Sequence, residues 1–154
     1  MAPFPSNPQI AGNSLRFPAL RLTAGAVPAK RGRMSGPTFE ITQQFTFDAA
    51  HQLAAGAEEN KRIHGHSFYA EVTLRGPADR DNAWVRDFGE VNAVLSVLRD
   101  ELDHRLLNEV EGLGTPTLEN LARFIFRRAK ARLPEVCRVK LSRPSYGQSC
   151  VYEE

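Results

Sequence analysis

The feature that most constrains the fold of this chain is a regular alternation of apolar and polar residues over positions 64–75. One side of the alternation holds His64, His66, Phe68, Ala70, Val72 and Leu74. A period of two residues is typical of a β-strand with one buried face. The two histidines therefore share one side of this strand, with backbones roughly 6.5 to 7 Å apart, so that both rings can reach one ion.

A third histidine, His51, precedes this strand, so that three of the four histidines fall within sixteen positions. A lone histidine on an apolar strand face is usually a hydrogen-bonded core residue. Three imidazole ligands with an open fourth position are instead the arrangement of catalytic zinc sites. The sequence therefore favours a Zn²⁺ site formed by His51, His64 and His66.

The remaining patterns predict three more strands and two helices. Positions 39–48, 137–142 and 148–152 alternate as strands do. Asp87 and Glu90 form a capping-box pattern at the start of a helix whose apolar stripe ends at Leu102. A second helix is expected from Thr115-Pro116-Thr117, with the proline suited to a first helical position, as far as Pro134.

The order β-β-α-α-β-β predicts an α+β domain with a four-stranded antiparallel sheet and both helices on one face. Such a small sheet leaves two edges to cover, so we expect a homo-oligomer.

Composition divides the chain into residues 1–37 and residues 38–154. The first part contains five basic and no acidic residues and is rich in Pro, Ala, Gly and Ser. We expect a disordered extension, or one that precedes a true start at Met34; an organelle targeting peptide has a similar composition. The second part is expected to fold. It has more acidic than basic residues, so the net charge of +2 does not indicate nucleic-acid binding.

The apolar runs and the cysteines bear on location. No apolar run approaches the ~18 residues that a membrane-spanning helix needs, so we expect no membrane association. Cys137 and Cys150 are the only cysteines. Without a convincing secretory signal, they favour free thiols in the cytoplasm.

Five short motifs together resemble the 6-pyruvoyl-tetrahydropterin synthase and 6-carboxy-tetrahydropterin synthase family, over about residues 38–152. In chain order they are Phe47-Asp48-Ala49-Ala50-His51, His64-Gly65-His66-Ser67-Phe68, Asp87-Phe88, Leu102-Asp103-His104-x-x-Leu107-Asn108 and Pro116-Thr117-x-Glu119-Asn120. The resemblance implies a tunnelling fold, in which subunits join their sheets into a barrel as trimers or hexamers. It also implies zinc held by His51, His64 and His66.

The activity implied by this resemblance is that of a zinc-dependent lyase. Its substrate would be the pterin 7,8-dihydroneopterin triphosphate. Because bacterial members mostly serve queuosine (7-deazaguanine) synthesis, the resemblance implies 6-carboxy-tetrahydropterin, or a related 6-substituted tetrahydropterin, as the product. Asp103 and His104 match the family's acid–base pair, a role that suits a histidine oriented by a carboxylate. The alternative interpretation of this pair is a helix C-terminal cap with an exposed histidine.

Two positions depart from the family pattern. The nucleophilic Cys that the family places four residues before His-Gly-His is Asn60 here, an amide that can only hydrogen-bond. The glutamate that anchors the pterin ring falls on Pro144, which offers no side-chain acceptor. A zinc-binding family member without the parental activity is therefore the alternative hypothesis, unless Glu58 or Glu59 replaces the thiol. A zinc hydrolase with another substrate would also fit the histidines, with no further support in the chain.

Overall fold

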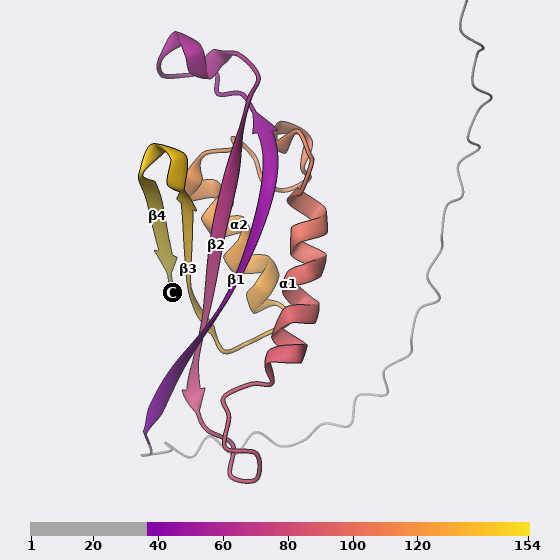
Figure 1. Cartoon of the computed structure of the whole chain (residues 1–154), viewed down its shortest axis with the longest axis vertical. Helices are drawn as coiled ribbons and strands as arrows, with labels where there is room; N and C mark the ends of the chain where they lie inside the picture. Colours follow the sequence, from indigo (N-terminus) through magenta and orange to yellow (C-terminus); the bar gives the residue numbers. More distant parts are fainter. Residues whose placement is uncertain (1–36) are drawn as a thin grey trace, which may run out of the picture. The chain divides into compact units, whose positions relative to one another are not determined.

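The computed structural model describes residues 37–154, which form a four-stranded antiparallel sheet and two α-helices (Figure 1). The elements in chain order are β1 (Thr38–His51), β2 (His64–Pro77), α1 (Phe88–Leu102), α2 (Leu118–Lys130), β3 (Val136–Arg143) and β4 (Gln148–Glu153). Three short 3-10 turns are η1 (Glu58–Lys61), η2 (Leu107–Glu109) and η3 (Pro144–Tyr146). The predicted α+β order is confirmed. The predicted extension lies outside the described residues apart from its last position, Pro37.

The strand order β1-β2-β3-β4 follows the chain, and β1 and β2 form its longest hairpin. Their register runs from Thr38 opposite Pro77 to His51 opposite His64. β2 pairs with β3 through Tyr69 opposite Ser142, and the register shifts between Thr73 and Leu74. The hairpin therefore brings the end of β1 to the start of β2, where the predicted metal ligands lie.

One face of the sheet carries the core, and the other is polar. The largest fully buried side chains come from the strands, the helices and η2; they are Phe68, Phe126, Leu74, Leu95, Leu102, Leu107, Leu121, Ile125, Leu141, Val72, Val91 and Val136. On the opposite face, Glu40 pairs with Arg75 on the neighbouring strand, and Glu71 pairs with Lys140. This division explains the alternation in the sequence, because successive strand residues point to opposite faces.

Helix α1 begins as predicted, although its cap is only half of a capping box. The Asp87 carboxylate accepts hydrogen bonds from the backbone N–H groups of Gly89 and Glu90. The Glu90 side chain pairs with Arg86 at 3.0 Å instead of reaching back to Asp87. The second half of the predicted capping box, in which the Glu90 side chain accepts from the Asp87 N–H, is therefore not formed.

Helix α2 differs from the prediction at both ends. Its N-cap is Thr117, whose hydroxyl accepts from Asn120 N–H, so that Pro116 precedes the cap and is not a first-turn residue. The helix ends at Lys130 instead of reaching Pro134. The N–H of Leu133 still bonds to the carbonyl oxygen of Ala129 at 2.8 Å, so an irregular turn extends beyond the helix as far as Leu133.

Within residues 37–154, no helix is both long enough and apolar enough to cross a bilayer.

Candidate metal centre

The hairpin brings the three predicted ligands together. His51 closes β1, His64 opens β2 directly opposite, and His66 lies two residues further on the same face. The centroid of the His51 ring lies 4.5 Å from that of the His64 ring and 5.1 Å from that of the His66 ring. One nitrogen from each ring lies within 4.8 Å of the others. Three imidazole nitrogens at this separation can bind one ion after small rotations of the rings.

Backbone carbonyl groups orient two of the rings. The His51 Nδ1 lies 2.8 Å from the carbonyl oxygen of Pro116, and the His64 Nδ1 lies 2.8 Å from that of Arg62. Because a carbonyl oxygen only accepts, each Nδ1 carries the proton and each Nε2 keeps its lone pair. Such outer hydrogen bonds are those that fix metal-binding histidines in other proteins.

Two ring nitrogens are buried without a hydrogen-bond partner among the described residues: His51 Nε2 and His66 Nδ1. An unpaired buried nitrogen is costly, on the order of 1–3 kcal/mol, unless a ligand satisfies it. The donor set and these unpaired atoms fit a zinc ion with an open position.

Burial also favours the neutral form of the His51 and His66 rings. Desolvation is the main cause that lowers the pKa of His51, and it lowers the pKa of His66 to about 4 together with the nearby positive charge of Arg143. A neutral imidazole is the form that binds a metal ion.

Two residues near His66 were not predicted to belong to the site. The Arg143 Nη1 lies 3.1 Å from His66 Nε2, and the Tyr146 ring meets the His66 ring edge-on at 5.1 Å between centroids. Arg143 is the last residue of β3, and Tyr146 is the last residue of the turn η3 that follows it. A Tyr after Pro-Ser at a turn gave no signal of this contact, because it depends on how β3 is aligned with β2.

Asp103 and His104 lie on a loop that hydrogen-bonds to the outer edge of β1. The Asp48 N–H donates to Asp103 Oδ1 at 2.9 Å, and the His104 N–H donates to the Asp48 carbonyl at 2.7 Å. His104 has a φ of 57°, an unusual value for a residue with a side chain. The loop thus imposes a strained backbone conformation on the predicted catalytic histidine.

The predicted acid–base pair makes a direct contact. Asp103 Oδ1 is 3.1 Å from His104 Nδ1, and the His104 side chain is 81% exposed. The hydrogen bond from Asp48 is the main cause that lowers the pKa of Asp103, with smaller contributions from His104 and Arg99. The carboxylate can therefore orient the ring, which leaves the His104 Nε2 to exchange protons.

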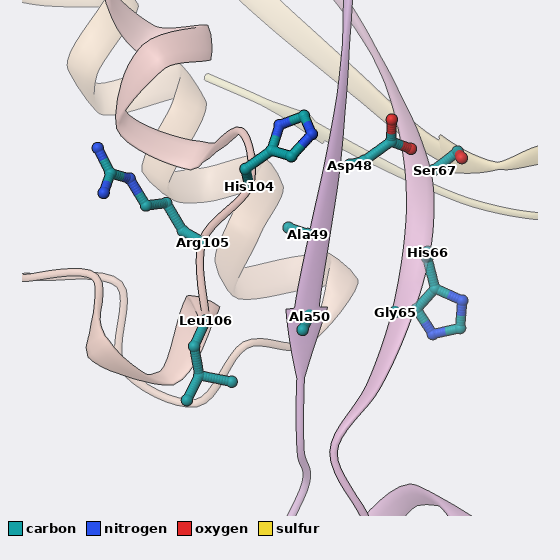
Figure 2. Close-up of a pocket in the computed structure, with 9 residues that line it drawn as sticks. All are labelled: Asp48, Ala49, Ala50, Gly65, His66, Ser67, His104, Arg105 and Leu106. Atoms are coloured by element: carbon teal, nitrogen blue, oxygen red, sulfur yellow. The ribbon is translucent and has the colours of Figure 1, made fainter. Parts of the chain in front are cut away.

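His66 and His104 both line a recess of about 590 Å³ beside β1. Figure 2 shows His104 on the loop to one side of β1 and His66 on β2, with β1 between them. They share the recess without touching each other.

The two positions that depart from the family pattern lie at turns. Asn60 belongs to η1, where its backbone carbonyl accepts from Leu53 N–H at 2.8 Å. Glu58, a predicted substitute for the missing thiol, is exposed and paired with Lys61 at 2.5 Å. Pro144 is the first residue of η3, directly after Arg143.

Comparisons with known proteins point to pterin enzymes. A dihydroneopterin monophosphate aldolase of Pyrococcus furiosus is 37% identical over 100 residues, 65% of this chain and 82% of that protein. A 6-carboxy-5,6,7,8-tetrahydropterin synthase of Synechocystis is 39% identical over 93 residues, 56% of this chain and 70% of that protein.

The comparison of structures leads to the same group of pterin enzymes. The structure of Caenorhabditis elegans 6-pyruvoyl tetrahydropterin synthase superposes with a TM-score of 0.68 at 26% identity, covering 77% of this chain and 96% of that chain. Residues 40–154 match the family described as 6-pyruvoyl tetrahydropterin synthase. The chain therefore belongs to the 6-pyruvoyl tetrahydropterin synthase family.

Proposed function

We propose that this protein is a zinc-dependent lyase that converts 7,8-dihydroneopterin triphosphate into 6-carboxy-tetrahydropterin, for queuosine or another 7-deazaguanine product. The observation that carries this proposal is the cluster of His51, His64 and His66, with unpaired ring nitrogens inside a domain of the pterin-synthase family. The sequence similarity to a 6-carboxy-tetrahydropterin synthase supports the choice of product.

The three histidines would hold the zinc ion, with the imidazole tautomers of His51 and His64 set by the carbonyl groups of Pro116 and Arg62. Zinc would supply Lewis acidity to the side-chain hydroxyls of the pterin, which makes the adjacent C–H protons more acidic. A base must remove such a proton. His104 accepts it at Nε2, and the Asp103 carboxylate stabilises the resulting imidazolium at Nδ1.

The test is a mass-spectrometric assay of zinc-loaded protein with 7,8-dihydroneopterin triphosphate. We expect release of triphosphate and formation of 6-carboxy-tetrahydropterin by the wild type, and loss of both in His64→Ala. Zinc-loaded protein that leaves the substrate unchanged would contradict the proposal.

The alternative is a zinc-binding family member without the parental activity. Two observations favour it: Asn60 replaces the nucleophilic Cys, and Pro144 replaces the pterin-anchoring glutamate. This hypothesis predicts one zinc ion per chain and no conversion of the pterin. Turnover at a usual enzymic rate, above about 1 per second, would exclude it.

A second candidate activity is cleavage of a dihydroneopterin phosphate by aldol chemistry. It is favoured by the similarity to the Pyrococcus furiosus aldolase. Repeating the assay with 7,8-dihydroneopterin monophosphate beside the triphosphate separates the two activities, because an aldolase product retains a hydroxymethyl group on the pterin and the proposed lyase product carries a carboxylate.

We further propose that the protein is a cytoplasmic homo-oligomer, a trimer or hexamer. β1 and β4 are the edge strands of the sheet, and their unpaired groups can bond to another copy. Exposed apolar side chains on these strands, Phe39 and Val151, support this proposal. Light scattering after size-exclusion chromatography measures the number of chains; a monomer at micromolar concentration would contradict it.

A further inference from the structure

Arg143 makes a contact with His66 that cannot coexist with a bound metal ion. Its Nη1 lies 3.1 Å from His66 Nε2. A guanidinium only donates hydrogen bonds, so Nε2 must be the acceptor. The proton of the neutral ring then lies on Nδ1, which is the buried nitrogen without a partner.

Both ways of binding a metal through His66 break this contact. If the ion binds Nε2, the lone pair that accepts from Arg143 is used. If the ion binds Nδ1, the proton moves to Nε2, and two N–H groups face each other. Loading of the metal therefore releases Arg143 Nη1 from His66.

The released guanidinium stays close to the centre. Its Nη2 donates to Gln148 Oε1 at 2.5 Å, and its carbon atom lies 5.7 Å from the centre of the Tyr146 ring. Its Nε is buried and has no hydrogen-bond partner in the described part of the chain. Once Nη1 is free, two donor nitrogens of Arg143, Nε and Nη1, have no acceptor among the described residues.

Arg143 also forms no ion pair in the part of the chain that the structure describes, since no carboxylate there lies within ion-pair distance of it. The pKa of Glu119 is lowered mainly by hydrogen bonds from its own backbone and from Thr117. The positive charge of Arg143 lowers it to a smaller extent. A dication beside an unpaired guanidinium attracts an anion strongly, and charge-assisted bonds from arginine suit oxyanions.

We propose that Arg143 is a specificity-determining residue that binds an oxyanion of the ligand, a phosphate or a carboxylate, next to the metal ion. The inference rests on the proposed metal site and adds the charge of the ligand group. Arg143 thus contacts His66 in the metal-free protein and contacts the anionic ligand in the metal-loaded protein. It weakens binding of the ion alone and strengthens binding of an ion with an anionic ligand.

The test uses the full chain and three variants: Arg143→Gln, Arg143→Lys and the control Arg138→Gln. Arg138 lies on the same strand but pairs with Glu40 on the polar face, so its loss removes the same charge away from the site. Zn²⁺ affinity is measured by competition with a chelator. Anion affinity is measured on Co²⁺-loaded protein from its visible spectrum during titration with inorganic phosphate and, separately, with acetate.

We expect Arg143→Gln to bind Zn²⁺ about tenfold more tightly, because a like charge and a competing hydrogen bond are removed, and to bind phosphate or acetate about tenfold more weakly. Arg143→Lys keeps the charge and should bind anions with intermediate affinity, while Arg138→Gln should match the wild type. A larger effect on phosphate assigns Arg143 to a substrate phosphate, and a larger effect on acetate assigns it to a product carboxylate.

Two results separate this inference from the proposed function. Unchanged zinc and anion affinities in Arg143→Gln, with one metal ion still bound, overturn the role of Arg143 and leave the metal site in place. No metal binding by the wild type overturns both. If Arg143→Gln does not fold, an anion affinity of Arg143→Lys equal to that of the wild type overturns the inference.

Discussion

The His51 ring donates from Nδ1 to the carbonyl oxygen of Pro116 at 2.8 Å, and this buried hydrogen bond joins the end of β1 to the residue before the N-cap of α2. The first metal-ligand candidate is therefore also a structural link between the sheet and a helix.

This link predicts different stability costs for two ligand substitutions in the metal-free protein. His51→Ala leaves the Pro116 carbonyl without its donor, at a cost of about 1–3 kcal/mol in the free energy of unfolding. His64→Ala removes an exposed bond to Arg62 and should cost less than about 0.5 kcal/mol. Urea unfolding with a chelator present measures both values, and equal costs would contradict the link.

Asn60→Cys tests whether the missing thiol limits the reaction. The substitution restores a nucleophile at the position where the family places it, in the turn η1. We expect the zinc-loaded variant to convert 7,8-dihydroneopterin triphosphate at least about 100-fold faster than the wild type, the usual contribution of a positioned acid or base. Asn60→Ser is the matched control and should give no such gain. Equal rates for both variants would show that more than the thiol has been lost.

His104 allows the role of its ring to be separated from that of its backbone. At a φ of 57°, glycine is the favoured residue, so His104→Gly should be more stable than His104→Ala by about 1 kcal/mol. Both variants lack the imidazole and should lose about 100-fold or more in kcat while the bound zinc stays constant. Thermal unfolding gives the stability order. If His104→Gly keeps its activity, the ring is not catalytic, and Asp103 and His104 are a helix C-terminal cap with an exposed histidine.

The Asp103 carboxylate predicts a pH-dependent contribution to stability. Its folded pKa is lowered from 3.8, mainly by the hydrogen bond from Asp48 N–H. The native state therefore prefers the ionised form, and the contribution is fully present above pH 3.8 and is lost as the pH falls through the lower folded pKa.

Asp103→Asn keeps an oxygen acceptor but removes the charge, so it isolates this effect. We expect the wild type to be more stable at pH 7, with the difference shrinking below about pH 4. Denaturant unfolding at a series of pH values measures the difference in the free energy of unfolding between the two proteins. A difference that stays constant down to pH 2.5 would show that it arises from a change in packing and not from the charge.

The sequence predicted those parts of the molecule that depend on local periodicity. Alternation gave the four strands and the shared face of His64 and His66, and helical spacing gave α1 and α2. Phe124 and Phe126 are also buried, because α2 packs against β3, β4 and α1 and so buries a wider arc than one helical stripe.

Contacts between distant segments could not be predicted. Arg143 reaches His66 because β3 pairs with β2 in the register that places Ser142 opposite Tyr69, and no local pattern encodes this register. The docking of Asp103 on Asp48 likewise joins residues 55 positions apart. In isolation, Asp103 and His104 resemble an ordinary helix end, whereas the fold makes them part of a strained loop.

The pairing of His51 with His64 has a consequence for folding. A slip of one residue in this hairpin would turn the histidines of one strand to the polar face, away from those of the other. Only the native pairing can then gain the free energy of ion binding, which adds to the stability of that state alone. A bound metal ion would therefore stabilise the native pairing of the hairpin relative to slipped pairings. Slipped pairings expose Phe47 or Phe68 and so favour aggregation.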